Sequence, residues 1–129
     1  MSIETNRLKT GLIWEYHRLY SDKYQDWVLD IWHPHDVLKK SSFPTLKDDF
    51  IMTSGLMGET GEVIDCYKKF IRGNLKEETP EYKELQDELK LEIGDVIYYL
   101  NMIATRFNIR MREVIPVNIE KLEKRFKLV

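Results

Sequence analysis

The sequence has few residues that cross-link or interrupt a chain. Its 129 residues include one cysteine, Cys66, together with six glycines and four prolines. A single thiol excludes an intrachain disulfide and a zinc site built from cysteines, and it fits a reducing compartment. We expect a buried, unreactive thiol.

Long apolar runs and an excess of one charge are also missing. No apolar run approaches the roughly 18 residues that a membrane-spanning helix needs, and the first residues lack the basic start and apolar stretch of a secretion signal. The net charge of -2 gives no reason to expect nucleic acid or an anionic membrane as a partner. We therefore expect a cytoplasmic protein, and the length predicts one domain over residues 1–129.

The apolar residues that are present recur at three- and four-residue spacing over long stretches, which predicts an all-α fold. Ser21 and Asp22 could cap a second segment within the first helix. Pro116 is expected close to the first turn of the last helix, where a missing N–H costs least. The four expected helices cover about residues 6–32, 45–72, 79–107 and 112–127.

Short polar signals set these boundaries. Gly73 and Asn74 are typical of a helix C-terminus, so they end the second helix. Thr79 followed by Pro80 supplies an N-cap and a proline at the first helical position, which opens the third. Asn108 is a plausible end of that helix.

The second and third helices contain nearly the same six residues: Glu-Thr-Gly-Glu-Val-Ile at 59–64 and Glu-Ile-Gly-Asp-Val-Ile at 92–97. Acids three residues apart share one face of a helix, and in both copies they border the apolar stripe. Four carboxylates gathered beside apolar surface would repel one another, and a divalent cation removes that conflict. The predicted ligands of Mg²⁺, with Mn²⁺ as the alternative ion, are Glu59, Glu62, Glu92 and Asp95. The alternative is a set of ordinary acids on solvated faces.

A ferritin-like di-iron site is a rival use of carboxylates, but it needs Glu-x-x-His pairs and neither motif contains a histidine. Iron and zinc are therefore disfavoured. Gly61 and Gly94 occupy the same place in both motifs, inside helices where each costs about 1 kcal/mol relative to alanine. We expect another helix to approach closely there.

These residues resemble a known family. The stretch Gly-Glu-Thr-Gly-Glu-Val at 58–63, the segment Glu-Ile-Gly-Asp-Val-Ile-Tyr-Tyr-Leu at 92–100 and the ending Asn-Ile-Glu-Lys-Leu-Glu-Lys-Arg-Phe at 118–126 are similar to MazG-like all-α nucleoside triphosphate pyrophosphohydrolases. Tyr24-Gln25 is similar to a Tyr-Gln pair in that family's first helix. The resemblance implies a four-helix bundle that assembles as a homodimer or homotetramer, with the four acids as metal ligands and catalytic residues.

The same resemblance implies hydrolysis of nucleoside or deoxynucleoside triphosphates to the monophosphate and pyrophosphate. Glu62 or Glu59 could accept the proton of the attacking water. Phosphate and sugar contacts are expected from five further residues, with solvated faces or core packing as their alternative roles. They are Lys69, Tyr99, Asn118, Lys121 and Arg125.

Two other functions stay open at this point. One is a pyrophosphatase that is narrowly specific for dUTP, dCTP or phosphoribosyl-ATP. The other is a helical oligomerisation or regulatory module whose acids are solvated and non-catalytic.

Overall fold

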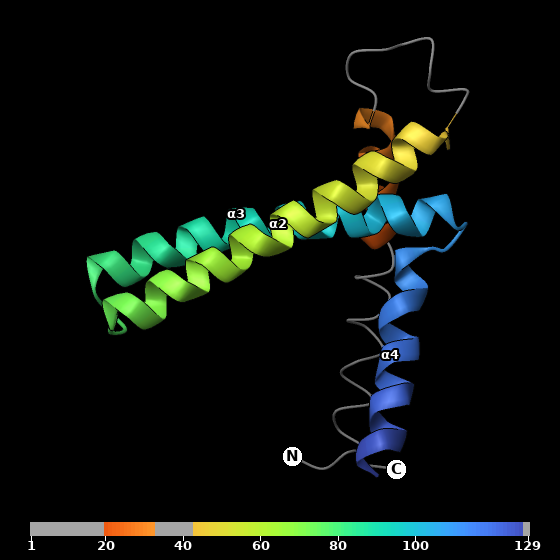
Figure 1. Cartoon of the computed structure of the whole chain (residues 1–129). Coiled ribbons are helices and arrows are strands. Elements are labelled where there is room, and N and C mark those ends of the chain that lie inside the picture. Colours follow the sequence, from red (N-terminus) through yellow and green to blue (C-terminus); the bar gives the residue numbers. More distant parts are fainter. Residues whose placement is uncertain (1–19, 33–42, 128–129) are drawn as a thin grey trace. The chain divides into compact units, whose positions relative to one another are not determined.

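The computed structural model of this chain describes residues 20–32 and 43–127, and all the regular structure within them is helical. The expected all-α fold is confirmed for this part of the chain (Figure 1). The expected start of the first helix, at residues 6–19, lies outside the described residues, as do the three histidines. The helices comprise residues 20–31, α2 (Leu46–Gly73), α3 (Pro80–Arg106) and α4 (Met111–Phe126).

The chain divides into two compact units, which are described here one at a time. One unit comprises residues 1–37 and 104–129, and the other comprises residues 38–103. The last residues of α3 thus belong with α4 and the helix at 20–31, whereas α2 and most of α3 form the second unit. Within the described residues, no helix is long and apolar enough to cross a membrane.

Side chains next to α2 satisfy the backbone groups that a helix leaves free at its ends. The Thr45 hydroxyl accepts from the Asp48 N–H at 3.2 Å, and the Asp48 carboxylate accepts from the Thr45 N–H at 2.7 Å, which completes a capping box. At the other end Asn74 takes a left-handed conformation, with φ 46°, and its N–H donates to the carbonyls of Phe70 and Ile71. Both predicted ends of α2 are confirmed.

The polar turn after α2 leads into α3 as predicted. Pro80 is the first residue of α3, and the Thr79 hydroxyl accepts from the Tyr82 N–H at 3.2 Å. At the far end Asn108 has φ 57°, and the Ile109 N–H returns to the Ala104 carbonyl at 2.8 Å. A left-handed residue just past the last turn is a common way to end a helix.

Two details of the expected helices are wrong. Pro116 is the sixth residue of α4, inside the helix, because α4 already begins at Met111. Its missing N–H leaves the carbonyl of Arg112, four residues earlier, without its usual helical partner. The helix at 20–31 also runs unbroken through Ser21 and Asp22, so these two residues do not cap a separate segment there.

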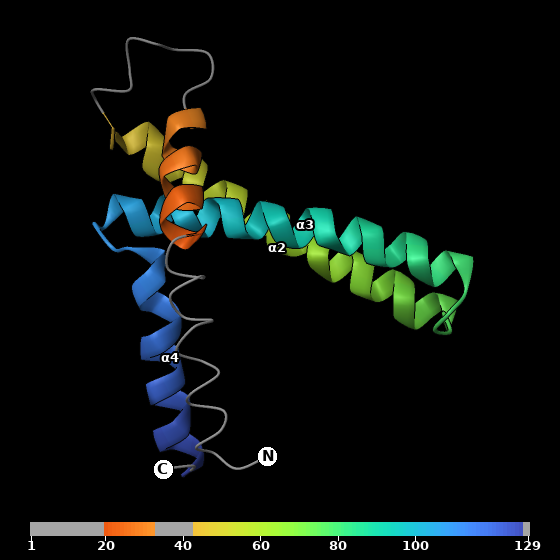
Figure 2. The same cartoon turned by 180° about the vertical axis from the view of Figure 1, so that it is seen from behind.

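In the second unit α2 and α3 run side by side in opposite directions (Figures 1 and 2). The side chains of Met52, Cys66 and Met102 are each 2% exposed or less. Burial raises the pKa of the Cys66 thiol, with a further contribution from the charge of Glu88. The expected burial of this thiol is thus confirmed, and a raised pKa is in line with the expected low reactivity.

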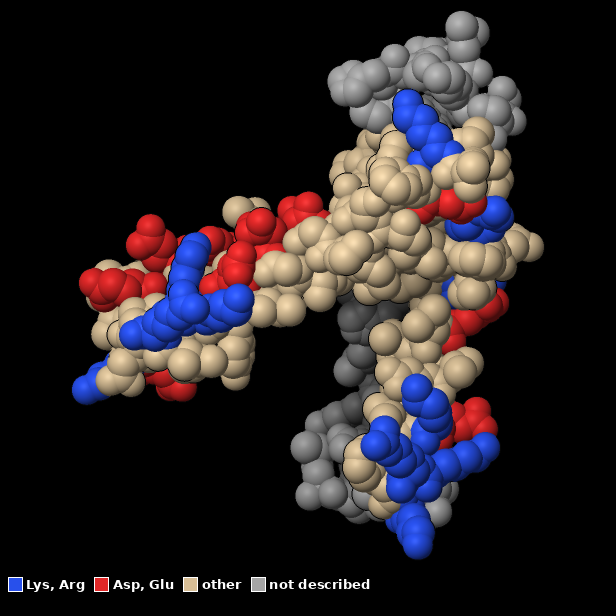
Figure 3. All heavy atoms as spheres, viewed as in Figure 1, with Lys and Arg blue, Asp and Glu red and all other residues tan. Residues whose placement is uncertain are grey.

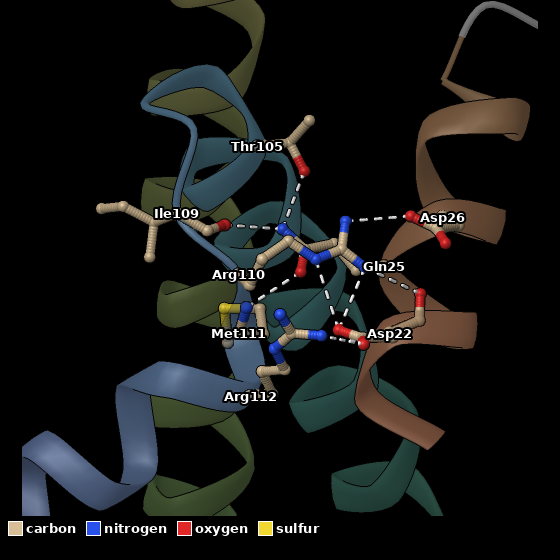
Figure 4. A network of polar contacts seen from close by, with 8 residues as sticks. All are labelled: Asp22, Gln25, Asp26, Thr105, Ile109, Arg110, Met111 and Arg112. Carbon is tan, nitrogen blue, oxygen red and sulfur yellow. Dashed lines mark hydrogen bonds and ion pairs between the residues drawn. The ribbon is translucent and has the colours of Figure 1, made fainter. Parts of the chain in front are cut away.

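In the other unit a single buried amide holds the turn between α3 and α4 (Figure 4). Gln25, on the helix at 20–31, is 2% exposed. Its Nε2 donates to the Thr105 hydroxyl at 3.0 Å and to the Ile109 carbonyl at 2.8 Å, and its Oε1 accepts from the Met111 N–H at 2.9 Å. Gln25 therefore joins the end of α3 to the start of α4.

Ion pairs surround this amide on its more exposed side. Arg110 contacts Asp22 at 3.1 Å and Asp26 at 2.9 Å, and Arg112 contacts Asp22 at 2.6 Å (Figure 4). Burial by itself would raise the pKa of Asp22, but hydrogen bonds and charges from Arg112 and Arg110 outweigh it, so this pKa is lowered. The carboxylate stays charged and bridges two arginines.

Replacing Gln25 by leucine should destabilise the protein by about 1–3 kcal/mol, because it leaves the partly buried Met111 N–H and Ile109 carbonyl without their partner. Urea denaturation followed by circular dichroism measures this change. The matched control is Gln86→Leu, on the exposed surface of α3, which should change stability by less than about 0.5 kcal/mol. Equal effects of the two substitutions would contradict the role assigned to Gln25.

Candidate metal site

Three of the four predicted acids meet between α2 and α3. One carboxylate oxygen from each of Glu59, Glu92 and Asp95 lies within 4.8 Å of the other two. Glu59 comes from α2 and the other two from α3, and Glu59 and Glu92 are half-buried whereas Asp95 is exposed. The opposite directions of the two helices let one turn of α2 face one turn of α3 at this level.

The electrostatics of this acid cluster are unfavourable. Burial raises the pKa of Glu59, and so do the negative charges of Asp95, Glu92 and Glu62 and a hydrogen bond with Glu92. A carboxyl group whose neighbours are carboxylates holds its proton to a higher pH. The donor atoms are all hard carboxylate oxygens, with no thiolate or imidazole among them, and such a set fits Mg²⁺ or Mn²⁺.

The fourth predicted ligand lies beside the acid cluster. Glu62 is exposed and is not among the three acids whose oxygens converge, although its charge contributes to the raised pKa of Glu59. It lines a surface pocket on the outside of α2 together with four other residues of that helix. These are Asp65, Lys68, Lys69 and Arg72.

Lys69, the predicted phosphate ligand of α2, reaches across to α3. Its ammonium group contacts the Glu88 carboxylate at 2.7 Å, and its side chain is 59% exposed. The hydrogen bond and the charge of Glu88 raise the pKa of Lys69. A phosphate group would have to compete with this carboxylate for the lysine.

Tyr99 is seated against the backbone of α2, next to the acid cluster. The end of its ring occupies the space that a Cβ atom on Gly55 would need, with the phenol oxygen 2.7 Å from that position. Burial raises the pKa of Tyr99, and so do the charges of Glu59 and Asp95. The ring is thus packed between the helices, in line with the core role that was the alternative to contact with a nucleotide.

The glycines of the two acidic motifs do not bring helices of this chain together. A Cβ atom added at Gly61 or Gly94 would meet no described residue within 4 Å. No helix in the described part of the chain makes a close approach at these two glycines, and Gly55 makes one instead. A close approach by a helix of another copy stays a prediction. The sequence contains a signal for this contact. Gly55 lies one helical turn before Glu59 and Tyr99 lies one turn after Asp95, so in antiparallel helices with facing acids these two residues also face each other.

The remaining predicted residues lie on α4, in the other unit. Asn118, Lys121 and Arg125 are all exposed, and α4 has no buried residue. The Arg125 guanidinium lies 5.6 Å from the centre of the Phe126 ring. Lys and Arg side chains gather near the end of α4 (Figure 3). Whether these residues contact the same substrate as the acids stays a prediction.

Comparison with known proteins identifies the family. Residues 51–129 match the MazG nucleotide pyrophosphohydrolase domain, so the chain belongs to this family. It is also 34% identical over 74 residues to the Gene 37 protein of Mycobacterium phage L5. That match covers 57% of this chain and 62% of the phage protein. No solved structure matches the chain.

The family match includes both acidic motifs and the whole of α4. The segment that carries Gln25 precedes it. Around Gln25, a polar network is formed by Asp22, Asp26 and Arg110. The sequence predicted none of these contacts, and only the resemblance of Tyr24-Gln25 to the family's Tyr-Gln pair drew attention to this segment. These contacts join residues more than 80 positions apart, and no local pattern indicates them.

Gly55→Ala should destabilise the protein by about 1–3 kcal/mol, because the added methyl group displaces the Tyr99 ring. The control is Gly94→Ala, where the new Cβ meets open space and the better helix propensity should add up to about 1 kcal/mol of stability. Chemical denaturation measures both changes. A neutral or stabilising Gly55→Ala would show that the ring does not occupy this position.

Stability should depend on pH through Glu59. Its pKa is raised in the folded state above the ordinary value of 4.5, so its contribution is fully present below that value and is lost as the pH rises through the folded pKa. Glu59→Gln should remove this loss. The stability of the variant relative to that of the unmodified protein should therefore increase as the pH rises. Thermal unfolding between pH 4 and 8 without divalent ions measures the difference. Parallel curves for the two proteins would contradict the prediction.

Proposed function

We propose that this chain hydrolyses nucleoside or deoxynucleoside triphosphates to the monophosphate and pyrophosphate. The observation that supports this most is the meeting of the Glu59, Glu92 and Asp95 oxygens in a member of the MazG nucleotide pyrophosphohydrolase family. A charged triphosphate needs positive charge beside it, and these three carboxylates have no cation among the described side chains at their meeting point. A divalent ion would supply that charge.

The proposed cofactor is Mg²⁺, with Mn²⁺ as a substitute. When bound, such an ion neutralises phosphate charge and lowers the pKa of water. Glu59, Glu92 and Asp95 would hold it, and Glu62 completes the set of four ligands proposed from the sequence. The half-buried position of Glu59 and Glu92 fixes their carboxylates against the facing helix, which orients the ligand oxygens before substrate arrives.

The proposed proton acceptor for the attacking water is Glu62. It lies outside the group of three converging oxygens and is exposed, so one of its two carboxylate oxygens can accept from water while the other is available to the ion. Glu59 is the weaker candidate because its carboxyl group already interacts with Glu92. A general base must also lie within hydrogen-bond reach of the proton it removes.

The proposed phosphate ligands include Lys69, which would exchange its partner Glu88 for a phosphate oxygen. A compact ammonium group suits this role because it binds phosphate as a point charge. Tyr99 would form a fixed wall beside the sugar or base, held by its contact with Gly55. On α4 we propose Asn118, Lys121 and Arg125 as further phosphate ligands.

Narrower specificity, for dUTP, dCTP or phosphoribosyl-ATP, is compatible with the same site, since the acids act on the phosphates and not on the base. A cytoplasmic location and a homo-oligomeric assembly, a homodimer or a homotetramer, also form part of the proposal. The rival proposal is a non-catalytic helical module. The exposed apolar surface of α2 is compatible with such a module, but an oligomeric enzyme would share this surface, so it does not separate the two proposals.

Incubation with a panel of common nucleoside and deoxynucleoside triphosphates and Mg²⁺ should yield pyrophosphate and the monophosphate. Asp95→Asn and Glu62→Gln should each lower kcat at least about 100-fold, since both remove a charge proposed to act in the chemical step. The matched control is Asp65→Asn, an exposed acid of α2 that pairs with Lys68, which should retain full activity.

Release of orthophosphate in place of pyrophosphate would contradict the proposed cleavage position. An active Asp95→Asn variant would contradict the ligand assignment. No turnover of any triphosphate, combined with a melting temperature that Mg²⁺ does not raise, would favour the non-catalytic module, because an ion that binds the folded state must stabilise it.

A further inference from the structure

The contacts between α2 and α3 differ in chemistry on the two sides of the acid cluster. On one side the Tyr99 ring packs against Gly55. On the other side the Glu88 carboxylate holds the Lys69 ammonium group at 2.7 Å. An aromatic ring suits a base or a sugar, whereas a cation suits a phosphate. A nucleotide bound at the acids is therefore expected to direct its outer phosphates toward Lys69.

The distance from the acids to Lys69 is compatible with this direction. Glu88 precedes Glu92 by four residues, which corresponds to about 6 Å along α3. The Lys69 ammonium group contacts Glu88, so it lies about one helical turn from the acid cluster. The two outer phosphates of a triphosphate extend over a comparable length when the first phosphate faces the acids. Lys69 is therefore within reach of the pyrophosphate that the proposed reaction releases.

Three cations of α2 line the same surface pocket, and they differ in what holds them. Lys68 contacts Asp65 of the same helix at 3.6 Å, whereas Lys69 contacts Glu88 across the helix pair. Among the described residues, the Arg72 side chain has no ion-pair or hydrogen-bond partner. Lys and Arg side chains gather over this end of α2 (Figure 3). An anion that enters the pocket meets Arg72 directly, but it must displace Glu88 to reach Lys69.

Glu88 has a second contact that does not depend on Lys69. The Cys66 thiol, which is 2% exposed, forms a hydrogen bond with the Glu88 carboxylate. This hydrogen bond keeps the carboxylate between α2 and α3 after the lysine has left it. The negative charge of Glu88 is then no longer balanced, and it repels a phosphate nearby. Glu88 therefore opposes a bound anion in two ways, by competing for Lys69 and by direct repulsion.

We propose that Glu88 is a positioning residue for the release of pyrophosphate: it holds the Lys69 ammonium group in the free protein and binds it again when pyrophosphate leaves. This inference rests on the proposed function and adds a residue outside the set of metal ligands. The two side chains are 59% and 38% exposed, so their ion pair changes a binding equilibrium by about fivefold at most. Such a weak competitor yields to a polyphosphate with several charges, yet it shortens the time for which the product stays bound.

The first test measures the binding of pyrophosphate to the full chain with Mg²⁺, by isothermal titration calorimetry. Glu88→Gln removes the charge but keeps the size and an acceptor for Cys66, and it should tighten binding about two- to fivefold. The matched control is Asp87→Asn, the neighbouring exposed acid that pairs with Lys83 and Lys90. It should change binding less than about 1.5-fold, because its charge is screened by solvent. Equal effects of the two substitutions would overturn the proposal, as would an unmodified protein that does not bind pyrophosphate.

The second test asks whether Glu88 acts through Lys69. Lys69→Met should weaken pyrophosphate binding, and in that background Glu88→Gln should lose more than half of its effect, because the competition no longer exists. Arg72→Gln is the comparison, since Arg72 has no contact with Glu88. Its effect should add to that of Glu88→Gln. An undiminished effect of Glu88→Gln in the Lys69→Met background would overturn the proposed role.

The third test uses turnover of a triphosphate. Glu88→Gln should lower KM and strengthen inhibition by added pyrophosphate by the same two- to fivefold factor, with a nearly unchanged melting temperature. A purely structural Glu88 would give a lower melting temperature and a lower kcat, with unchanged inhibition by pyrophosphate. An unmodified protein that hydrolyses no triphosphate would contradict the proposed function, whereas the binding of pyrophosphate would still decide whether Glu88 competes for Lys69.

Discussion

The antiparallel packing of α2 against α3 is the contact on which the candidate site depends. Gly55 lies opposite Tyr99, Glu59 lies near Glu92 and Asp95, and Lys69 reaches Glu88. These contacts follow one another along the two helices in opposite order, so one register satisfies all of them. A slip of one helical turn would separate Glu59 from its partners and place the Tyr99 ring against a residue that has a side chain.

The parts of this arrangement that the sequence predicted are the local ones. Thr45, Asn74 and Thr79 act on backbone groups within a few residues of themselves, so their effect can be inferred from position alone. The convergence of acids could also be anticipated, because three-residue spacing fixes which side of a helix each one occupies. The separation of Glu62 from the other three acids could not be anticipated, since its distance from them depends on how the facing helix is placed.

Contacts between distant parts of the chain were not predictable in the same way. Gln25 is one polar residue among many in the sequence, and only the fold brings Ile109 and Met111 to its amide. The open space around Gly61 and the crowded space around Gly55 likewise depend on side chains from other elements. A glycine inside a helix therefore marks an unusual position, but it does not indicate whether the space beside it is open or crowded.

The amide of Gln25 also sets a limit on the length of the connection it holds. Its nitrogen donates hydrogen bonds to Thr105 and Ile109, and its oxygen accepts one from Met111. An inserted or deleted residue between α3 and α4 would therefore break at least one of these hydrogen bonds. The turn between α2 and α3 has no comparable long-range tether among the described contacts. Relatives that differ in length should accordingly differ at residues 74–79, and should keep the spacing from Thr105 to Met111 unchanged.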